Sequence, residues 1–303
     1  MRSDQEETDT RVVLYINYAQ AKGFKSVIVR TPGTDIFFIL LHHAHDLQIA
    51  IFIDTGTGKH RRTINISELA KQYGREWCTT LLSFYVFTGE DCTSAFKGRG
   101  KVAPLKKLMK YPKFHAFFRQ LGDEWSVEEE THKMIEDFTC SMYGYPKEKS
   151  INNVRGKMLR KMVGKDQLLN KKSKIDLARL PPCQDSIATH VQRVNYRLAC
   201  YKRANLSIYE RPKPFETDQG WHRSEHGELE PVWSRGPILP QSLVDLLETT
   251  NKDEEDDEEK EEQEDDMEIE TDDDDKLEDE MIQGHDDWDT YPSRNATHLK
   301  LKF

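Results

Sequence analysis

The chain has 303 residues, enough for one or two domains, and its formal net charge of −10 is unevenly distributed. Residues 251–303 hold 24 Asp and Glu against 6 Lys and Arg, which leaves 30 acids and 38 bases in residues 1–250. The body therefore carries about +8 and the tail about −18, and a basic body suits a phosphate-binding protein. The five cysteines form no CxxC pair, which argues against a zinc ribbon and a disulfide framework. The apolar run from Ile36 to Ile53 is broken by three histidines and an aspartate, which excludes a membrane span.

The first 87 residues alternate between helical and strand-like patterns. A helix is expected from a cap at Asp9 or Thr10 to about Lys22, and Val12, Val13, Ile16 and Ala19 form its apolar stripe. The elements expected after it are a strand at Ser26–Arg30, a helix from Thr34 or Asp35 to about His45, two strands at Gln48–Ile53 and Arg62–Ile66, a helix at Glu68–Tyr73 capped by Ser67, and a helix at Trp77–Phe87. Such alternation predicts an α/β fold in which a parallel sheet carries an added hairpin.

The chain after Lys101 is predicted to be mostly helical. The expected elements are a helix between Pro112 and Gly122, a helix to Met142 opened by a capping box at Ser126 and Glu129, a basic helix at Asn153–Val163, and a helix from Asp185 or Ser186 to about Arg203. Five prolines between residues 212 and 240 then predict a loop-rich strap, followed by a short helix at Ser242–Glu248. The acidic low-complexity run at Asp253–Glu280 predicts disorder.

The stretch Phe87 to Lys101, FTGEDCTSAFKGRGK, joins two apolar helical runs. Gly98 and Gly100 can adopt positive φ and expose backbone N–H groups, and Lys97, Arg99 and Lys101 add positive charge. Backbone N–H groups ahead of a helix suit a phosphate, so these five residues are candidate nucleic-acid contacts. The alternative is a plain helical corner with a soluble tip, because Gly-rich turns are common between helices.

The order of residues in this stretch resembles the helix–two-turn–helix of flap-endonuclease-type nucleases, which have a PIN-like fold. A closer resemblance is to a largely uncharacterised, transposon-associated group of animal proteins with the same module. It rests on EETDTR at residues 6–11, SVIVRTPGTDIFFILLHHA at 26–44, IDTGTGKHRR at 53–62 and FTGEDCTSAFKGRGK at 87–101, and the LPPCQDSIATHVQRVNYRLACYKR stretch resembles the group's C-terminal region. The resemblance implies a helix–two-turn–helix at residues 80–110 that grips the DNA backbone.

The same resemblance assigns metal-ligand and catalytic roles to four acids. Glu7 and Asp9 match the family's E-x-E/D pair, Asp35 matches the second acid of its D-x-D, and Asp91 matches the acid of its G-x-D. Carboxylates of this kind hold Mg²⁺ or Mn²⁺ in two-metal nucleases. The alternative for each residue alone is a helix N-cap or an exposed acid.

The sequence departs from the family's pattern in two places. Gly33 stands where the first aspartate of D-x-D is expected, and nothing before Glu7 supplies the family's first strand with its aspartates. A site short of several carboxylates is expected to hold Mg²⁺ or Mn²⁺ weakly or not at all, and catalysis by the chain alone is expected to be degenerate or absent.

Two further motifs are weak. His42, His43 and His45 include only two residues that share a helix face, which is too few for zinc. The GTGK run at residues 56–59 lacks the spacing of a phosphate loop, so an NTPase is rejected.

The sequence thus predicts three regions: a partial PIN-like module over residues 1–145, a helical extension with a strap over residues 146–250, and a disordered acidic tail over residues 251–303. The expected function is DNA or other nucleic-acid binding through phosphates, by a relative of Mg²⁺-dependent 5′-nucleases. The alternative is a non-enzymatic scaffold whose acidic tail binds basic proteins. An intracellular protein is expected, nuclear rather than cytoplasmic, with no membrane partner.

Overall fold

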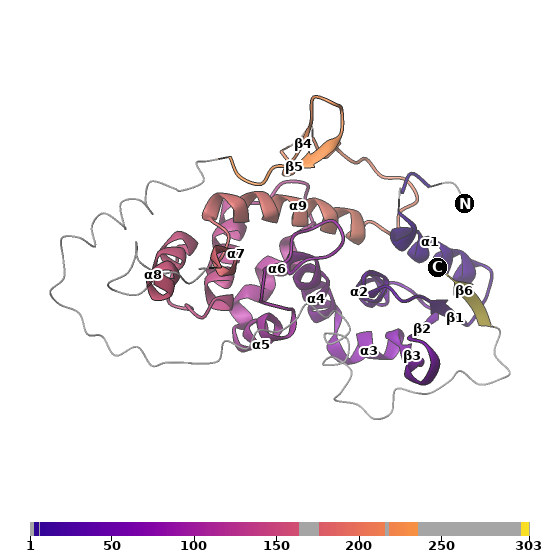
Figure 1. Ribbon diagram of the computed structural model, residues 1–303. Coiled ribbons are helices and arrows are strands. Elements are labelled where there is room, and N and C mark those ends of the chain that lie inside the picture. The colour runs from indigo at the N-terminus through magenta and orange to yellow at the C-terminus, as the bar shows by residue number, and fades with distance from the viewer. Residues whose placement is uncertain (1–2, 6, 164–175, 216–217, 236–297, 303) are drawn as a thin grey trace, which may run out of the picture.

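The computed structural model describes residues 3–5, 7–163, 176–215, 218–235 and 298–302. A four-stranded sheet of order β3-β2-β1-β6 lies at one end of the molecule, and a helical body extends away from it (Figure 1). The sheet consists of β1 (Ser26–Arg30), β2 (Ala50–Thr55), β3 (Arg62–Asn65) and β6 (His298–Lys302). The mixed α/β class is therefore confirmed, while the likeness to a PIN-like module stays a prediction.

The sheet is built on β1 and β2, whose short apolar runs are almost fully buried. These strands run parallel, with Val27 opposite Ile51 and Val29 opposite Ile53. The connection between them is α2 (Thr34–His43), whose mostly buried side chains explain the near-continuous apolar sequence from Ile36 to Leu41. β3 returns antiparallel to β2 through the 3₁₀ turn Gly58–His60, so the predicted hairpin is confirmed.

The helices of the body follow the predicted order. Their bounds, with α1 before the sheet, are α1 Thr8–Ala21, α3 Ile66–Tyr73, α4 Arg75–Phe87, α5 Val102–Lys110, α6 His115–Gln120, α7 Glu129–Met142, α8 Ile151–Val163 and α9 Gln184–Lys202, with short 3₁₀ turns at Pro112–Phe114 and Leu177–Arg179.

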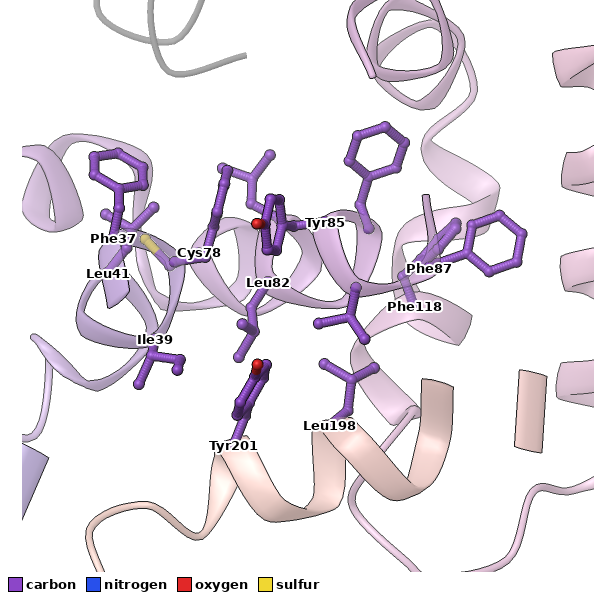
Figure 2. Close-up of a cluster of buried hydrophobic side chains, with 14 of the residues drawn as sticks. Phe37, Ile39, Leu41, Cys78, Leu82, Tyr85, Phe87, Phe118, Leu198 and Tyr201 are labelled. Atoms are coloured by element: carbon purple, nitrogen blue, oxygen red, sulfur yellow. The ribbon is translucent and has the colours of Figure 1, made fainter. Parts of the chain in front are cut away.

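The centre of the core is α4. Figure 2 shows Leu198 and Tyr201 pointing from α9 toward α4, with Leu82 between the two helices. Phe87, at the end of α4, is fully buried against Phe118 of α6. The helix at residues 184–202 thus shares one apolar core with the elements of the first 145 residues.

Three predicted caps were wrong. α1 starts after Glu7 rather than at Asp9 or Thr10. Asn65 caps α3 by accepting from the Glu68 N–H, while Ser67 Oγ accepts from the Ile51 N–H of β2. No capping box at Ser126 forms, because α7 begins after Glu128, which makes no side-chain cap.

Two short elements were missed. The predicted strap contains a hairpin of β4 (Trp221–Arg223) and β5 (Leu229–Pro231), which lies over α9 in Figure 1. The predicted disorder to Phe303 is wrong for residues 298–302, because β6 pairs parallel with β1. The expected helix at Ser242–Glu248 and the acidic run at Asp253–Glu280 lie outside the described residues.

Candidate functional site

The four acids predicted as a site lie near enough for their charges to interact. Glu7 precedes α1, Asp9 is in its first turn, Asp35 is in the first turn of α2 just beyond the carboxyl end of β1, and Asp91 follows α4. The charges of Asp9 and Asp91 both act on Asp35, and those of Glu7 and Asp91 both act on Asp9. A fifth carboxylate, Glu90, interacts with Asp35 and Glu7. We call Glu7, Asp9, Asp35, Glu90 and Asp91 the acidic cluster.

Asp35 is the most perturbed carboxylate of the acidic cluster. Burial raises its pKa from 3.8 to about 6, and the charges of Asp91 and Asp9 add to this, against a hydrogen bond from Tyr85 that lowers it. Its side chain is 9% exposed, and Oδ1 has no hydrogen-bond partner. An ionised carboxylate with an orphaned, buried oxygen is costly, so the site favours the protonated form of Asp35.

Arg197 of α9 supplies the positive charge of the site. Its Nη1 donates to Glu7 Oε1 at 2.5 Å, its Nε lies 3.4 Å from Glu90 Oε1, and its guanidinium lies 4.5 Å from the centre of the Tyr201 ring. Burial raises the pKa of Glu90, and Arg197 opposes that rise. The Tyr201 hydroxyl donates to the other Glu90 oxygen at 3.4 Å. Arg197 and Tyr201 are four residues apart, so one face of α9 closes the acidic cluster.

The acidic cluster borders the predicted nucleic-acid segment. α4 and α5 are joined by residues 88–101, which contain two turns, at Glu90–Thr93 and Phe96–Arg99. Lys101 is buried, and its ammonium donates to the carbonyls of Gly89 and Tyr85 at the end of α4. It also lies 4.5 Å from the centre of the Tyr85 ring, whose hydroxyl contacts Asp35. Lys101 therefore caps α4 and supports the acidic cluster, which is a role different from the predicted phosphate contact.

The other predicted phosphate contacts have different surroundings. Lys97 is exposed and forms an ion pair with Asp176 at 3.0 Å. Arg99 lies 4.4 Å from the centre of the Tyr143 ring, and burial lowers its pKa. Gly98 and Gly100 both adopt positive φ, and a Cβ at Gly98 would meet nothing within 4 Å. Lys97 and the backbone at Gly98 are thus the most accessible part of this turn.

The acidic cluster does not meet the needs of a divalent metal. Among the residues that the structure describes, no three or more His, Cys, Asp or Glu side chains are grouped so as to hold a metal ion. Arg197 occupies the space between Glu7 and Glu90 that a shared cation would need. Gly33 precedes α2 with φ −82°, and a Cβ there would meet only Thr31 Oγ1 at 3.5 Å, so an aspartate is sterically acceptable. The four predicted ligands converge, but as arranged they do not fit a metal.

The predicted histidine motif has no part in this site. His42 Nδ1 contacts Thr79 Oγ1 at 3.0 Å, while His43 Nε2 contacts the Tyr201 carbonyl at 2.9 Å. Burial lowers the pKa of both rings, so they are neutral core side chains.

The sequence prediction missed Glu90 and Arg197 as members of the site. Glu90 was visible as the neighbour of Asp91, but pairing of adjacent acids does not reveal which of the two is buried. Arg197 is 190 residues from Glu7, and only its four-residue spacing from Tyr201 marked a shared helix face.

Comparison with known proteins found no relative: no family model, no curated protein and no solved structure matches the chain. No helix among the described residues is long and apolar enough to cross a membrane.

Proposed function

We propose that this chain is a DNA-binding protein derived from a structure-specific, metal-dependent nuclease, with degenerate or absent catalysis. The observation that carries the proposal is the convergence of Glu7, Asp9, Asp35 and Asp91 beside the turns that join α4 and α5. Acids drawn from three separate helix ends, next to a phosphate-suited turn, are what a nuclease that has lost its two-metal arrangement would retain.

The charge of the adjoining segment supports binding to a phosphate backbone. Residues 92–122 contain no Asp or Glu. Their basic residues are Lys97, Arg99, Lys101, Lys106, Lys107, Lys110, Lys113 and Arg119. Lys106, Lys110 and Lys113 are exposed on or just after α5. A cationic surface without interleaved acids favours binding that depends on salt and little on sequence.

Catalysis would require Mg²⁺ or Mn²⁺, and weak or absent metal binding is proposed because Arg197 already pairs with two of the carboxylates. If cleavage does occur, Asp35→Ala and Asp91→Ala should each abolish it, because both would be metal ligands. Lys97→Ala should instead weaken DNA binding and leave the cleavage rate of the bound complex unchanged.

The test is fluorescence anisotropy of the full chain with labelled branched and single-stranded DNA at low salt. Binding at micromolar protein that weakens as salt rises supports the proposal, and its absence on both DNA forms would overturn it. Lys157→Ala, which removes a cation on α8 that is paired with Glu148, is the matched control for Lys97→Ala.

A second candidate is a scaffold protein whose acidic tail binds basic partners, and the charge of residues 251–303 favours it. Deleting the whole tail would also remove β6 from the sheet. The cleaner variant replaces the acids of residues 253–280 with Asn and Gln. Tighter DNA binding by that variant at low salt would show that the tail competes with DNA for the basic body, and unchanged binding would exclude this competition.

A further inference from the structure

Arginines from three separate segments of the chain bring their charges to the end of α7, at Tyr143. The Arg99 guanidinium, from the second turn between α4 and α5, lies 4.4 Å from the centre of the Tyr143 ring and donates to its hydroxyl. Arg155 is on α8, which packs against α7 (Figure 1), and its charge acts on Tyr143. Arg179 ends the 3₁₀ turn Leu177–Arg179, and its charge acts on Arg99. We call Arg99, Tyr143, Arg155 and Arg179 the arginine cluster.

Two contacts hold the segment that carries Arg179. Lys97 Nζ pairs with Asp176 Oδ2 at 3.0 Å, which ties the start of the segment to the turn between α4 and α5. Arg155 Nη1 donates to the Pro181 carbonyl, which ties the end of the segment to α8. Arg179 lies between these two contacts in the sequence, so it is held between that turn and α8.

Several hydrogen-bond donors of the arginine cluster are left for a ligand. Arg155 Nε is buried and makes no hydrogen bond, and the Arg179 side chain is exposed. Burial raises the pKa of Tyr143 to about 12, so its hydroxyl keeps its proton. Because the hydroxyl oxygen accepts from Arg99, that proton is available to an acceptor. A buried donor without an acceptor is rare and costly, which indicates that the arginine cluster suits an anion.

The acids that lie near these arginines in the sequence are already paired with lysines. Asp176 pairs with Lys97, and Glu148 pairs with Lys157 at 2.7 Å. Burial lowers the pKa of Arg155, as expected of a cation that is partly removed from water. An added anion would therefore offset the cost of burying the Arg155 charge.

We propose that the arginine cluster binds a phosphate group, which accepts hydrogen bonds from Arg99, Arg155, Arg179 and the Tyr143 hydroxyl. A phosphate presents several acceptor oxygens around one centre, and guanidinium groups bind such oxygens in parallel pairs of N–H···O bonds. A carboxylate has only two oxygens, which are too few for donors that come from four directions. The inference goes beyond the proposed function, because a phosphate site on α7, α8 and the turn after them does not require DNA.

The test is isothermal calorimetry with inorganic phosphate on the full chain, in a chloride buffer of low ionic strength. Arg179→Gln should weaken phosphate binding by about tenfold, because a charge-assisted hydrogen bond is lost. Arg179 is exposed, so its replacement leaves the packing of the fold intact. Tyr143→Phe removes only the hydroxyl and should weaken binding by about threefold to tenfold.

The matched control is Lys157→Gln, which removes a cation of α8 that is paired with Glu148. It should leave phosphate affinity unchanged, and a loss equal to that of Arg179→Gln would reduce the effect to net charge and overturn the proposal. The proposal also fails if the wild type shows no saturable phosphate binding, or if Arg179→Gln binds phosphate as tightly as the wild type does.

The phosphate group can belong to a nucleic-acid backbone or to a free phosphate compound. Fluorescence anisotropy of labelled single-stranded DNA with the wild type and Arg179→Gln distinguishes them. Weaker DNA binding by the variant assigns the site to the backbone, whereas equal DNA binding alongside weaker phosphate binding assigns it to a free phosphate compound. A chain that binds phosphate but no DNA overturns the proposed function alone, and one that binds DNA but no phosphate overturns this inference alone.

Discussion

Replacing Asp35 with Asn should make the protein more stable at alkaline pH, with an effect that grows as the pH rises. The pKa of Asp35 is 3.8 in an ordinary setting and about 6 in the folded protein, so folding holds its proton more tightly. Its favourable contribution is complete below about pH 3.8 and is lost as the pH rises through 6. A difference of about two pKa units corresponds to about 3 kcal/mol, of which about 1.4 kcal/mol appears between pH 5 and pH 8.

The assay is urea unfolding of the wild type and Asp35→Asn at pH 5 and pH 8, comparing the free energies of unfolding. Asn keeps an acceptor for the Tyr85 hydroxyl. The change in unfolding free energy on substitution at pH 8, minus the change at pH 5, therefore isolates the effect of the Asp35 charge. Asp46→Asn is the control, since the hydrogen bond from Arg75 lowers the pKa of Asp46, so its contribution to stability should be the same at pH 5 and pH 8. A gain from Asp35→Asn that is the same at both pH values would refute the reasoning.

Three further predictions are tested by urea unfolding, two of them with a control substitution. Lys101→Met should lower the free energy of unfolding by about 1–3 kcal/mol, because buried carbonyls at the end of α4 lose their donor. The control Lys97→Met should change it by less than about 0.5 kcal/mol. Equal losses in the two variants would contradict the capping role of Lys101. Burial lowers the pKa of His190 to about 4, so wild-type stability should fall as the pH drops from about 6.5 toward 4, and His190→Gln should flatten that slope. Gly89→Ala should lower the free energy of unfolding by more than about 2 kcal/mol, because φ of Gly89 is +113° and a Cβ there would lie 2.8 Å from Ala95 Cα. The control Gly23→Ala should lower it by about 1 kcal/mol, because Gly23 also has a positive φ but a Cβ there would meet no atom within 4 Å.

The sheet and most helices could be predicted because each depends on a local pattern. The apolar run of β1 and the continuous apolar sequence of α2 are both visible in the amino-acid sequence itself. The caps were less predictable, since Ser67 was equally able to cap α3 or to bond β2, and only the packed sheet decides between them. β6 was hidden because its pairing with β1 joins residues 272 positions apart and its five residues follow an acidic run.

Site residues that belong to a sequence motif could be predicted. Those that reach the site only through tertiary packing could not. Asp35 and Asp91 carry a resemblance in their sequence neighbourhood, and the fold brings their charges together. Lys101 belongs to the same motif, yet its ammonium turns inward, because α4 ends with buried carbonyls beside it. Arg197 lies in a helix with no site motif, and its role follows from packing of α9 against the ends of α1 and α4.

The central claim, binding to a phosphate backbone, is tested most directly by the salt dependence of DNA affinity. The measurement is the anisotropy-derived association constant of the full chain for duplex-containing branched DNA over a series of salt concentrations. Three or more phosphate contacts predict a slope of log K against log salt of about −3 or steeper, and Lys97→Met should reduce its magnitude by about 1. A slope near zero, or one unchanged by loss of Lys97, would contradict binding through phosphates at the turn between α4 and α5.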